Sequence, residues 1–306
     1  MLRIENARKS YQSTVALDGC SLAVGEREWL GLLGPNGAGK TSLIRAISGR
    51  VHLDAGTIEL FGAALNGERA HDAALRHRLG VVPQEIALYP TLTARENLET
   101  FAGFKGIRGA TRRERVEWAL EFTGLADRAD DLTKHFSGGM KRRLNIACGV
   151  LHRPALILLD EPTVGVDPQS RQRIWEMLAQ LREGGAALLI TTHQLDEAQQ
   201  LCDRIVIIDH GRSIASGTVP ELIASTIGMR HEVSLRLDAP PPAALAADGL
   251  RIDGRAIVGR LGNVASELPA LLARIAASDR IVEDVQLGSP TLHSVFIALT
   301  GRELRE

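Results

Sequence analysis

The sequence predicts an α/β fold in which a parallel sheet is interrupted by a helical insertion and followed by a small C-terminal α/β appendage. Short, continuous apolar runs stand at 29–33, 156–159 and 187–190, and such runs are typical of strands that helices cover on both faces. Between the first and second runs, residues 85–153 show apolar residues at helical spacing. The pattern changes again near residue 226, where the appendage is expected to begin.

The composition is that of an ordinary globular protein with room for one large domain and one small domain. Of its 306 residues, 44% are hydrophobic and 24% are charged, so a sizeable core is expected. The 36 Lys and Arg residues against 37 Asp and Glu residues leave a net charge of −1. A general nucleic-acid binder needs a basic surplus that this sequence lacks, so no nucleic-acid partner is expected.

The apolar runs are far too short to cross a bilayer, and the first residues do not have the pattern of a signal peptide. We therefore expect a soluble cytoplasmic protein without direct membrane insertion. Cys20, Cys148 and Cys202 are widely separated and lie among apolar neighbours, which favours buried free thiols in a reducing compartment.

The first part of the chain alternates strands with polar turns. We expect strands at 2–4, 15–24, 29–33, 56–62 and 79–82 and a helix over 70–77. Polar residues at 10–13 and 25–26 mark the turns between the first three strands.

Two capping boxes indicate where helices of the insertion begin. Thr93-x-x-Glu96 and Thr111-x-x-Glu114 are each followed by apolar residues at helical spacing, and glycines at 103, 106 and 124 end these helices. The last helix of the insertion begins after Ser137, a residue type suited to the N-cap.

From residue 155 strands and helices alternate again. We expect strands at 156–159, 187–190 and 204–208, a hairpin turn at 209–212, a helix from Asp167-Pro168 to the glycines at 184–185, and a helix capped by Thr218-x-x-Glu221. The appendage is expected to hold strands at 232–237, 250–252, 255–261 and 280–287 and helices at 266–277 and 290–299.

A glycine-rich turn between a buried strand and a helix carries the strongest functional signal. The pattern G-x-x-x-x-G-K-[ST] and the residue after it comprise Gly34, Pro35, Asn36, Gly37, Ala38, Gly39, Lys40, Thr41 and Ser42. Glycines let the backbone approach an anion closely, and successive N–H groups point into one concavity at the positive end of the helix dipole. Lys40 adds a charge for the β- and γ-phosphates, and the Thr41 hydroxyl is placed to bind Mg²⁺.

Two consecutive carboxylates, Asp160 and Glu161, follow the buried run 156–159. At the end of a strand beside the phosphate loop, the first can hold Mg²⁺ and the second can polarise an attacking water as a general base. The alternative is a strand end that meets solvent. The phosphate loop favours the functional interpretation.

Other positions leave a structural and a functional interpretation open. Tyr11 at a strand end can pack or contact a ligand, Gln84 can reach Mg²⁺ or the water, and His193 can hydrogen-bond a phosphate oxygen. Ser137-Gly138-Gly139 offers a hydroxyl and bare N–H groups at a helix N-terminus for another phosphate, or only a cap. The other histidines show no metal-ligand spacing.

Taken together, residues 1–225 resemble the ATP-binding cassette family, the ATPase subunits of ABC transporters. The family's motifs occur in order: Tyr11 resembles the adenine-stacking aromatic, 34–42 the Walker A loop, Gln84 the Q-loop, 136–140 the signature, 156–161 the Walker B motif, 164–167 with Asp167 the D-loop, and His193 the switch histidine. The resemblance implies a P-loop NTPase (RecA-like) core with an antiparallel β subdomain and the helical insertion. It also implies hydrolysis of ATP, with Mg²⁺ held by Thr41, Gln84 and Asp160 and with Glu161, His193 and Gln84 in catalysis.

The resemblance further implies a head-to-tail dimer of two copies of the chain. Each ATP would lie between the Walker A loop of one copy and Ser137, Gly138 and Gly139 of the other. Hydrolysis would release the dimer, and the motion would pass through a groove beside Gln84 to separately encoded transmembrane permease subunits. The chain would then be peripheral on the cytoplasmic face of the membrane, with residues 1–225 as the nucleotide-binding domain, 85–153 as its helical subdomain and 226–306 as an accessory domain.

Two departures from the commonest family pattern carry information. The signature has Met140 in place of Gln and continues Lys141-Arg142-Arg143, and the D-loop reads Val-Gly-Val-Asp. With the segment 291–302, these variants look like the ABC-2 exporter subgroup, which serves drug, antibiotic, polysaccharide or lipid-linked export.

The alternative is a soluble cassette acting on nucleic acid or ribosomes. Ser137 lies only 97 positions after Lys40 (137 minus 40), which leaves no room for the long coiled coil of such proteins.

Overall fold

The computed structural model of the chain describes residues 1–246 and 249–301, which form two compact units. The first is Met1–Ser216, and the second begins at Gly217. The sequence predicts this boundary after residue 225, whereas in the structure α8 (Val219–Thr226) packs against α10 (Leu292–Thr300) and belongs to the second unit. Arg302, the last residue of the expected exporter-like segment, lies outside the described residues.

A six-stranded sheet with the order β10-β9-β3-β8-β7-β6 is the centre of the first unit. Its strands are β3 (Trp29–Leu33), β6 (Leu79–Val82), β7 (Leu156–Asp160), β8 (Ala187–Thr192), β9 (Arg204–Asp209) and β10 (Arg212–Gly217). The pairs β9-β3, β3-β8, β8-β7 and β7-β6 are parallel. Every residue of β3, β7 and β8 is buried, which is why these strands read as continuous apolar runs. The predicted parallel sheet is confirmed.

A second, antiparallel sheet has the order β2-β1-β4-β5. It consists of β1 (Leu2–Tyr11), β2 (Thr14–Val24), β4 (Ala55–Leu60) and β5 (Ala63–Ala64). Strand β1 extends well beyond the expected residues 2–4, because register shifts after Ile4 and Lys9 keep it paired with β2 through a polar stretch. The buried side chains of this sheet share one core cluster with α1 (Lys40–Ile47).

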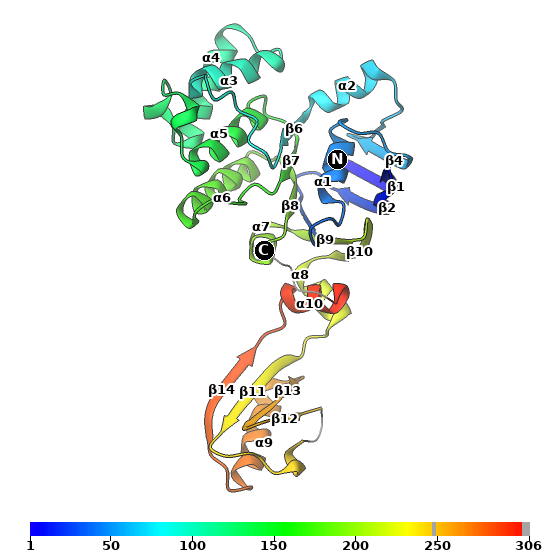
Figure 1. Cartoon of the computed structure of the whole chain (residues 1–306), viewed down its shortest axis with the longest axis vertical. Coiled ribbons are helices and arrows are strands. Elements are labelled where there is room, and N and C mark those ends of the chain that lie inside the picture. The colour runs from blue at the N-terminus through cyan, green and yellow to red at the C-terminus, as the bar shows by residue number, and fades with distance from the viewer. Residues whose placement is uncertain (247–248, 302–306) are drawn as a thin grey trace. The chain divides into compact units, whose positions relative to one another are not determined.

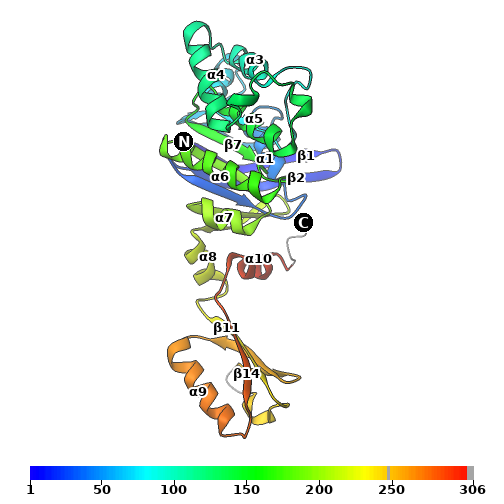
Figure 2. The same cartoon turned by 90° about the vertical axis from the view of Figure 1, so that its left-hand side faces the viewer.

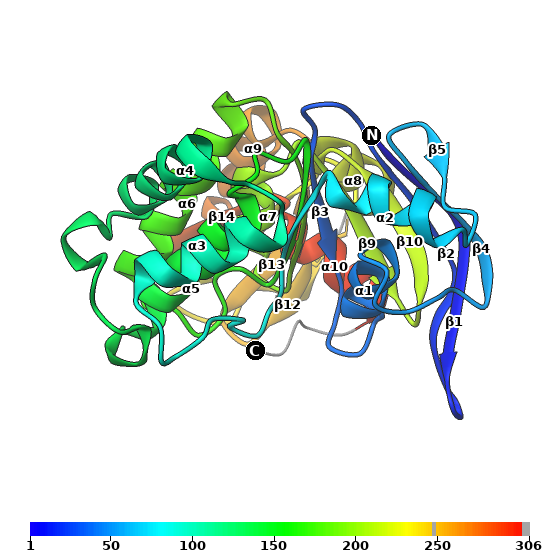
Figure 3. The ribbon, with the colours of Figure 1, turned by 90° about the horizontal axis from the view of Figure 1, so that it is seen from above.

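The predicted insertion contains α3 (Ala94–Phe104), α4 (Gly109–Thr123) and α5 (Gly138–Val150). Figures 1 and 3 show these helices grouped with α6 (Pro168–Glu183) on one side of the first unit, with β1, β2 and β4 on the other. The capping box at Thr93 is present. The one at Thr111 is wrong: α4 begins at Gly109 with Arg108 as its N-cap, so Thr111 lies inside the helix.

Helices α2 (Arg69–His77) and α7 (Leu195–Leu201) complete the regular structure of the first unit. In the part of the chain that the structure describes, no helix combines the length and the apolarity that crossing a bilayer requires.

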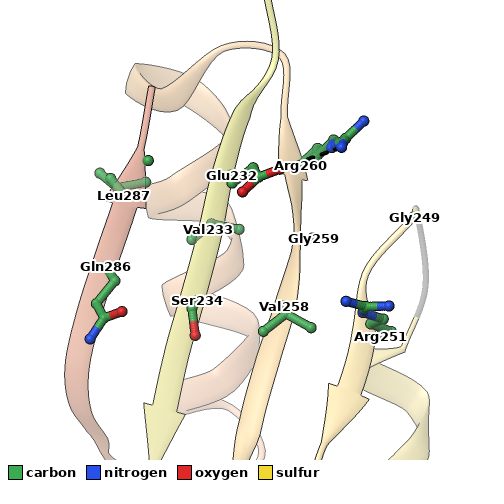
Figure 4. Close-up of a pocket in the computed structure, with 11 residues that line it drawn as sticks. Glu232, Val233, Ser234, Gly249, Arg251, Val258, Gly259, Arg260, Gln286 and Leu287 are labelled. Carbon is green, nitrogen blue, oxygen red and sulfur yellow. Dashed lines mark hydrogen bonds and ion pairs between the residues drawn. The ribbon is translucent and has the colours of Figure 1, made fainter. Parts of the chain in front are cut away.

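The second unit is a four-stranded antiparallel sheet with the order β12-β13-β11-β14. Its strands are β11 (His231–Leu237), β12 (Arg251–Asp253), β13 (Ala256–Leu261) and β14 (Val282–Gly288), and α9 (Val264–Ala276) packs on one face (Figure 2). The other face is open. A hollow of about 700 Å³ lies on that face. Figure 4 shows two of its lining residues, Ser234 and Val258, between the longer side chains of Gln286 and Arg251.

Candidate active site

The turn from β3 to α1 is a loop that only glycine can build at two of its positions. A Cβ atom on Gly34 would lie 2.3 Å from the backbone oxygen of Ile208, and one on Gly39 would lie 2.3 Å from that of Ala16. Gly39 also has φ of 107°, which a side chain disfavours. The backbone of the strands that contain Ala16 and Ile208 is therefore in direct contact with the loop. The loop presents its N–H groups at the start of α1.

Lys40, the first residue of α1, is 5% exposed. Its Nζ donates hydrogen bonds to the carbonyl oxygens of Gly34 at 2.7 Å and Pro35 at 3.2 Å. Burial lowers the pKa of Lys40, and the carboxylates of Glu161 and Asp160 oppose that shift. The loop thus holds a cation inside a cavity, where its field is weakly screened.

Asp160 and Glu161 stand at the end of β7, next to Thr191 at the end of β8. The Thr191 hydroxyl donates to Asp160 Oδ1 at 2.5 Å, and the Glu161 N–H lies 3.1 Å from both Oγ1 and the carbonyl oxygen of Thr191. Glu161 has φ of 48°, a left-handed conformation that residues other than glycine rarely adopt. Thr191 therefore fixes both carboxylate residues at the strand ends.

Glu161 is the point at which the predicted catalytic side chains meet. Its Oε2 accepts a hydrogen bond from Gln84 Nε2 at 3.0 Å, and its Oε1 lies 3.4 Å from His193 Nδ1 and 3.8 Å from Lys40 Nζ. These four residues line one cavity of about 590 Å³ together with the loop residues 36–42. The structure thus brings the phosphate loop, Gln84, Glu161 and His193 to one place.

The three residues expected to bind Mg²⁺ share a smaller cavity. Thr41, Gln84 and Asp160 line a space of about 170 Å³. A hydroxyl, an amide and a carboxylate supply the oxygen ligands that Mg²⁺ prefers, so the side chains fit this ion. Across residues 1–246 and 249–301, no cluster of three or more His, Cys, Asp or Glu residues suited to a metal competes with them.

Tyr11 does not line the cavity beside Lys40. Its ring is exposed at the end of β1, with Lys9 Nζ 5.8 Å from the ring centre. Its cross-strand partner on β2, Thr14, does line that cavity, so Tyr11 is adjacent to it.

The signature and the D-loop lie on other helices. Ser137 caps α5 by accepting a hydrogen bond from the Met140 N–H at 3.2 Å, and Asp167 caps α6 by accepting one from the Ser170 N–H at 2.9 Å, which lowers the pKa of Asp167. A Cβ atom on Gly139 would lie 2.1 Å from Ser170 Oγ, so the two helix starts are in close contact. None of Ser137, Gly138 and Gly139 is among the described residues that line the cavity beside Lys40.

Sequence reasoning missed two buried side chains that hold the Gln84 loop. Arg142 on α5 donates from Nη1 to the carbonyl oxygens of Gln84 at 2.6 Å and Pro83 at 3.3 Å, and Asn145 Oδ1 accepts from the Ala87 N–H at 3.1 Å. Burial lowers the pKa of the Arg142 guanidinium. The only sequence signal was the unusual Lys141-Arg142-Arg143 after the signature.

A third missed residue is Glu197 on α7, a buried carboxylate. It accepts hydrogen bonds from the hydroxyls of Thr163 and Thr192, the latter at 3.0 Å, and from Trp175 Nε1 at 3.3 Å. Nothing in the sequence distinguishes Glu197 from its acidic neighbour Asp196.

The glycine-rich loop after β3 and the paired carboxylates after β7 define a P-loop nucleoside triphosphatase. The family model described as ABC transporter matches residues 17–164. The linearmycin resistance ATP-binding protein of Bacillus subtilis (strain 168) is 40% identical over 320 residues, which cover 100% of this chain and 100% of that protein. This chain therefore belongs to the ABC transporter family of ATP-binding proteins.

Two further comparisons agree with this assignment. The daunorubicin/doxorubicin resistance ATP-binding protein of Streptomyces peucetius is 39% identical over 303 residues, covering 96% of this chain and 90% of the relative. A solved dimeric ATP-binding cassette in a post-hydrolysis state with ADP and Pi has a TM-score of 0.66 and 28% identity, over 71% of this chain and 98% of that one. The expected family, P-loop fold and ATPase activity are confirmed. The comparisons give no support to a cassette that acts on nucleic acid.

Proposed function

We propose that the chain is the ATP-hydrolysing subunit of a drug or antibiotic exporter, and that two copies close around two ATP molecules. One observation carries the proposal: Glu161 meets Lys40, Gln84 and His193 in a single cavity, while Ser137 of the same chain lies outside it. A complete site then needs the signature of a second copy. The dimeric form of the similar solved cassette supports this arrangement.

The residues divide the chemistry between them. The loop N–H groups and Lys40 bind the β- and γ-phosphates, and Mg²⁺ bound by Thr41, Asp160 and Gln84 would neutralise charge on the phosphate oxygens. Glu161 accepts a proton from the water that attacks the γ-phosphorus, as the bond from that phosphorus to the bridging oxygen of ADP breaks. His193 donates to a γ-phosphate oxygen, and the exposed Tyr11 ring stacks on adenine.

The transport role rests on the relatives. Two of them are named as resistance proteins for linearmycin and for daunorubicin or doxorubicin, which favours a small-molecule cargo. Separately encoded permease subunits would span the membrane and hold this chain on its cytoplasmic face. Because a ligand that binds only the closed pair shifts the population toward it, ATP binding and release would drive the permease between two states.

Replacing the proposed general base tests the enzymatic half of the proposal. In Glu161→Gln the shape is kept and the base is lost, so ATP binding and ATP-dependent dimers should persist while turnover falls by about a hundredfold or more. Gel filtration with Mg²⁺ and ATP and a phosphate-release assay measure both properties. Glu26→Gln, at an exposed turn residue, is the matched control. Steady-state hydrolysis by Glu161→Gln at the control rate would remove Glu161 from this role.

A further inference from the structure

The sheet of the second unit has one long edge without a partner. Its edge strands are β12, with three residues, and β14, with seven. Strand β14 pairs with β11 from Glu232↔Gly288 to Leu237↔Val282, and no other described strand pairs with it. Natural edges are usually kept short or protected by Lys, Pro or bulges, because their free N–H and C=O groups invite another strand. Strand β12 follows that rule through its length, whereas β14 has a single bulge at its start, between Val282 and Asp284, and its residues 284–288 pair regularly with β11.

Two apolar side chains of β14 lie on the same face of the sheet as the core of this unit, but outside that core. Val285 is opposite Leu235, and Leu287 is opposite Val233. Leu235 and Val233 are 0% and 2% exposed beneath α9, whereas Val285 and Leu287 are 43% and 44% exposed. Figure 4 shows β14 at the border of the sheet, with the helix behind the central strands. Helix α9 thus covers the centre of this face and leaves its edge uncovered.

The sequence of β14 is complementary to itself in one antiparallel register. With Gln286 on a two-fold axis, Val285 would stand opposite Leu287 of a second copy, and Asp284 would stand opposite Gly288 of that copy. The acidic residues of the two strands then lie at opposite ends, whereas parallel pairing would set acid against acid. Glu283 is in addition paired with Arg236 at 3.6 Å within its own copy. This charge arrangement favours a second copy in antiparallel orientation, which is the symmetry of a C2 dimer.

We propose that two copies of the chain associate through β14, edge to edge and antiparallel, so that their small sheets become one continuous sheet. This contact goes beyond the proposed nucleotide-dependent pairing, because it buries Val285 and Leu287 and completes backbone hydrogen bonds without ATP. Its consequence is a permanent tether: when hydrolysis opens the cassettes, the two copies stay at a high effective concentration and re-close without a diffusional search.

Cysteine cross-linking of the full-length protein in the absence of nucleotide tests the register. In Gln286→Cys the two thiols would face each other across the axis, with Cα atoms about 4.5–5.5 Å apart, which a disulfide can span. In the matched control Asp284→Cys, two residues away on the same strand, the two Cα atoms would be about 13 Å or more apart. The native Cys20, Cys148 and Cys202 have raised thiol pKa values through burial, so the wild type gives a low background.

The proposal predicts a disulfide-linked dimer on a non-reducing gel for Gln286→Cys and little for Asp284→Cys or the wild type. No dimer for Gln286→Cys, or equal yields for the two variants, would overturn it. A second variant, Val285→Lys with Leu287→Lys, changes only exposed side chains and should weaken the nucleotide-free dimer at least about tenfold by light scattering. An unchanged dimer mass in this variant would also contradict the proposal.

The two kinds of pairing are separable in the same protein. In a Glu161→Gln background, Val285→Lys with Leu287→Lys should still dimerise when ATP and Mg²⁺ are added, because the cassettes close through other residues. ATP-dependent dimers without any nucleotide-free cross-link would overturn the β14 contact alone. A nucleotide-free Gln286→Cys cross-link, together with no pairing of the Glu161→Gln, Val285→Lys, Leu287→Lys protein on addition of ATP and Mg²⁺, would overturn the proposed function and leave the β14 contact supported.

Discussion

The Thr192 hydroxyl lies 3.0 Å from Glu197 Oε2 and donates a hydrogen bond to it. Thr192 directly precedes His193, and the same carboxylate accepts from Thr163, two residues after Glu161. Glu197 therefore links the segment that follows Glu161 to the end of β8, which directly precedes His193. Three neutral donors satisfy this buried charge, so the arrangement is stable only while all of them stay in place.

We expect Glu197→Gln to reduce kcat by about ten- to a hundredfold, because an amide cannot accept all three hydrogen bonds and a small displacement of His193 or Glu161 is costly in catalysis. The ATP dissociation constant should stay within about twofold, since the phosphate loop is untouched. Nucleotide titration and a steady-state assay give the two values. Asp196→Asn, the exposed neighbour, is the control. Loss of ATP binding in parallel with kcat would mean that Glu197 supports the fold as a whole and has no specific positioning role.

Thr93 and Thr111, which both have the spacing of a capping box, allow a paired stability test. Thr93→Ala removes a side-chain oxygen that accepts from the Glu96 N–H at 3.1 Å, so the free energy of unfolding should fall by about 1 kcal/mol. Thr111→Ala lies inside α4 and should change it by less than about 0.5 kcal/mol, because alanine favours helix interiors. Urea unfolding of both variants measures the difference. Equal losses would contradict the helix start at Gly109.

These two threonines also show what the sequence predicts well and what it does not. Both have the capping-box spacing, and only tertiary context decides that α4 begins at Gly109, three residues before the start that a Thr111 N-cap predicts. Local patterns sufficed for the buried strands β3, β7 and β8, because burial on both faces leaves a continuous apolar run. They failed for the length of β1, whose polar residues are held by bulged pairing with the next strand, β2.

Gly139 is predicted to be intolerant of any side chain because of its contact with Ser170. A Cβ atom there would lie 2.1 Å from Ser170 Oγ and 2.5 Å from Ser170 Cβ, so Gly139→Ala should lower the free energy of unfolding by about 1–3 kcal/mol. Ser170→Gly in the same chain removes both clashing atoms and should recover part of the loss in a double-mutant cycle. If Gly139→Ala has no effect on thermal unfolding, α5 and α6 are not in contact at this point.

Because of His152, we expect the free energy of unfolding to fall in mild acid. Burial, with help from Lys105 and His77, lowers the pKa of His152 from 6.5 to about 4, and its Nε2 bonds the Leu79 carbonyl at 2.9 Å while Nδ1 has no hydrogen-bond partner among the described residues. Because the unfolded chain binds the proton first, this stability is complete above pH 6.5 and is lost as the pH falls to about 4. We expect a contribution of about 1–2 kcal/mol, allowing for partial solvent access.

His152→Gln keeps a donor for Leu79 and cannot titrate, so its unfolding free energy should depend less steeply on pH between 6.5 and 4. Chemical denaturation of both proteins across that range provides the comparison. Parallel curves would mean that His152 takes up its proton equally in the folded and unfolded chains.

As for the fold, some residues of the site can be predicted from the sequence and others cannot. The phosphate loop and the pair Asp160-Glu161 could be found from sequence, because their chemistry requires fixed residue types at short spacing. Arg142, Thr191 and Glu197 could not, because each acts across the fold on a segment far from it in the chain. Their roles follow only from which carbonyl, hydroxyl or carboxylate they meet.

The central claim is that each ATP is hydrolysed at a site formed by two copies of this chain. The most direct measurement mixes two inactive variants, Lys40→Ala and Ser137→Arg, and follows phosphate release. Each variant alone should be inactive, whereas the mixed dimer contains one site with an intact loop from one copy and an intact signature from the other, so activity of up to about a quarter of the wild-type rate should appear. Near wild-type hydrolysis by either variant alone, or no recovery in a mixture shown to contain mixed dimers, would contradict the account.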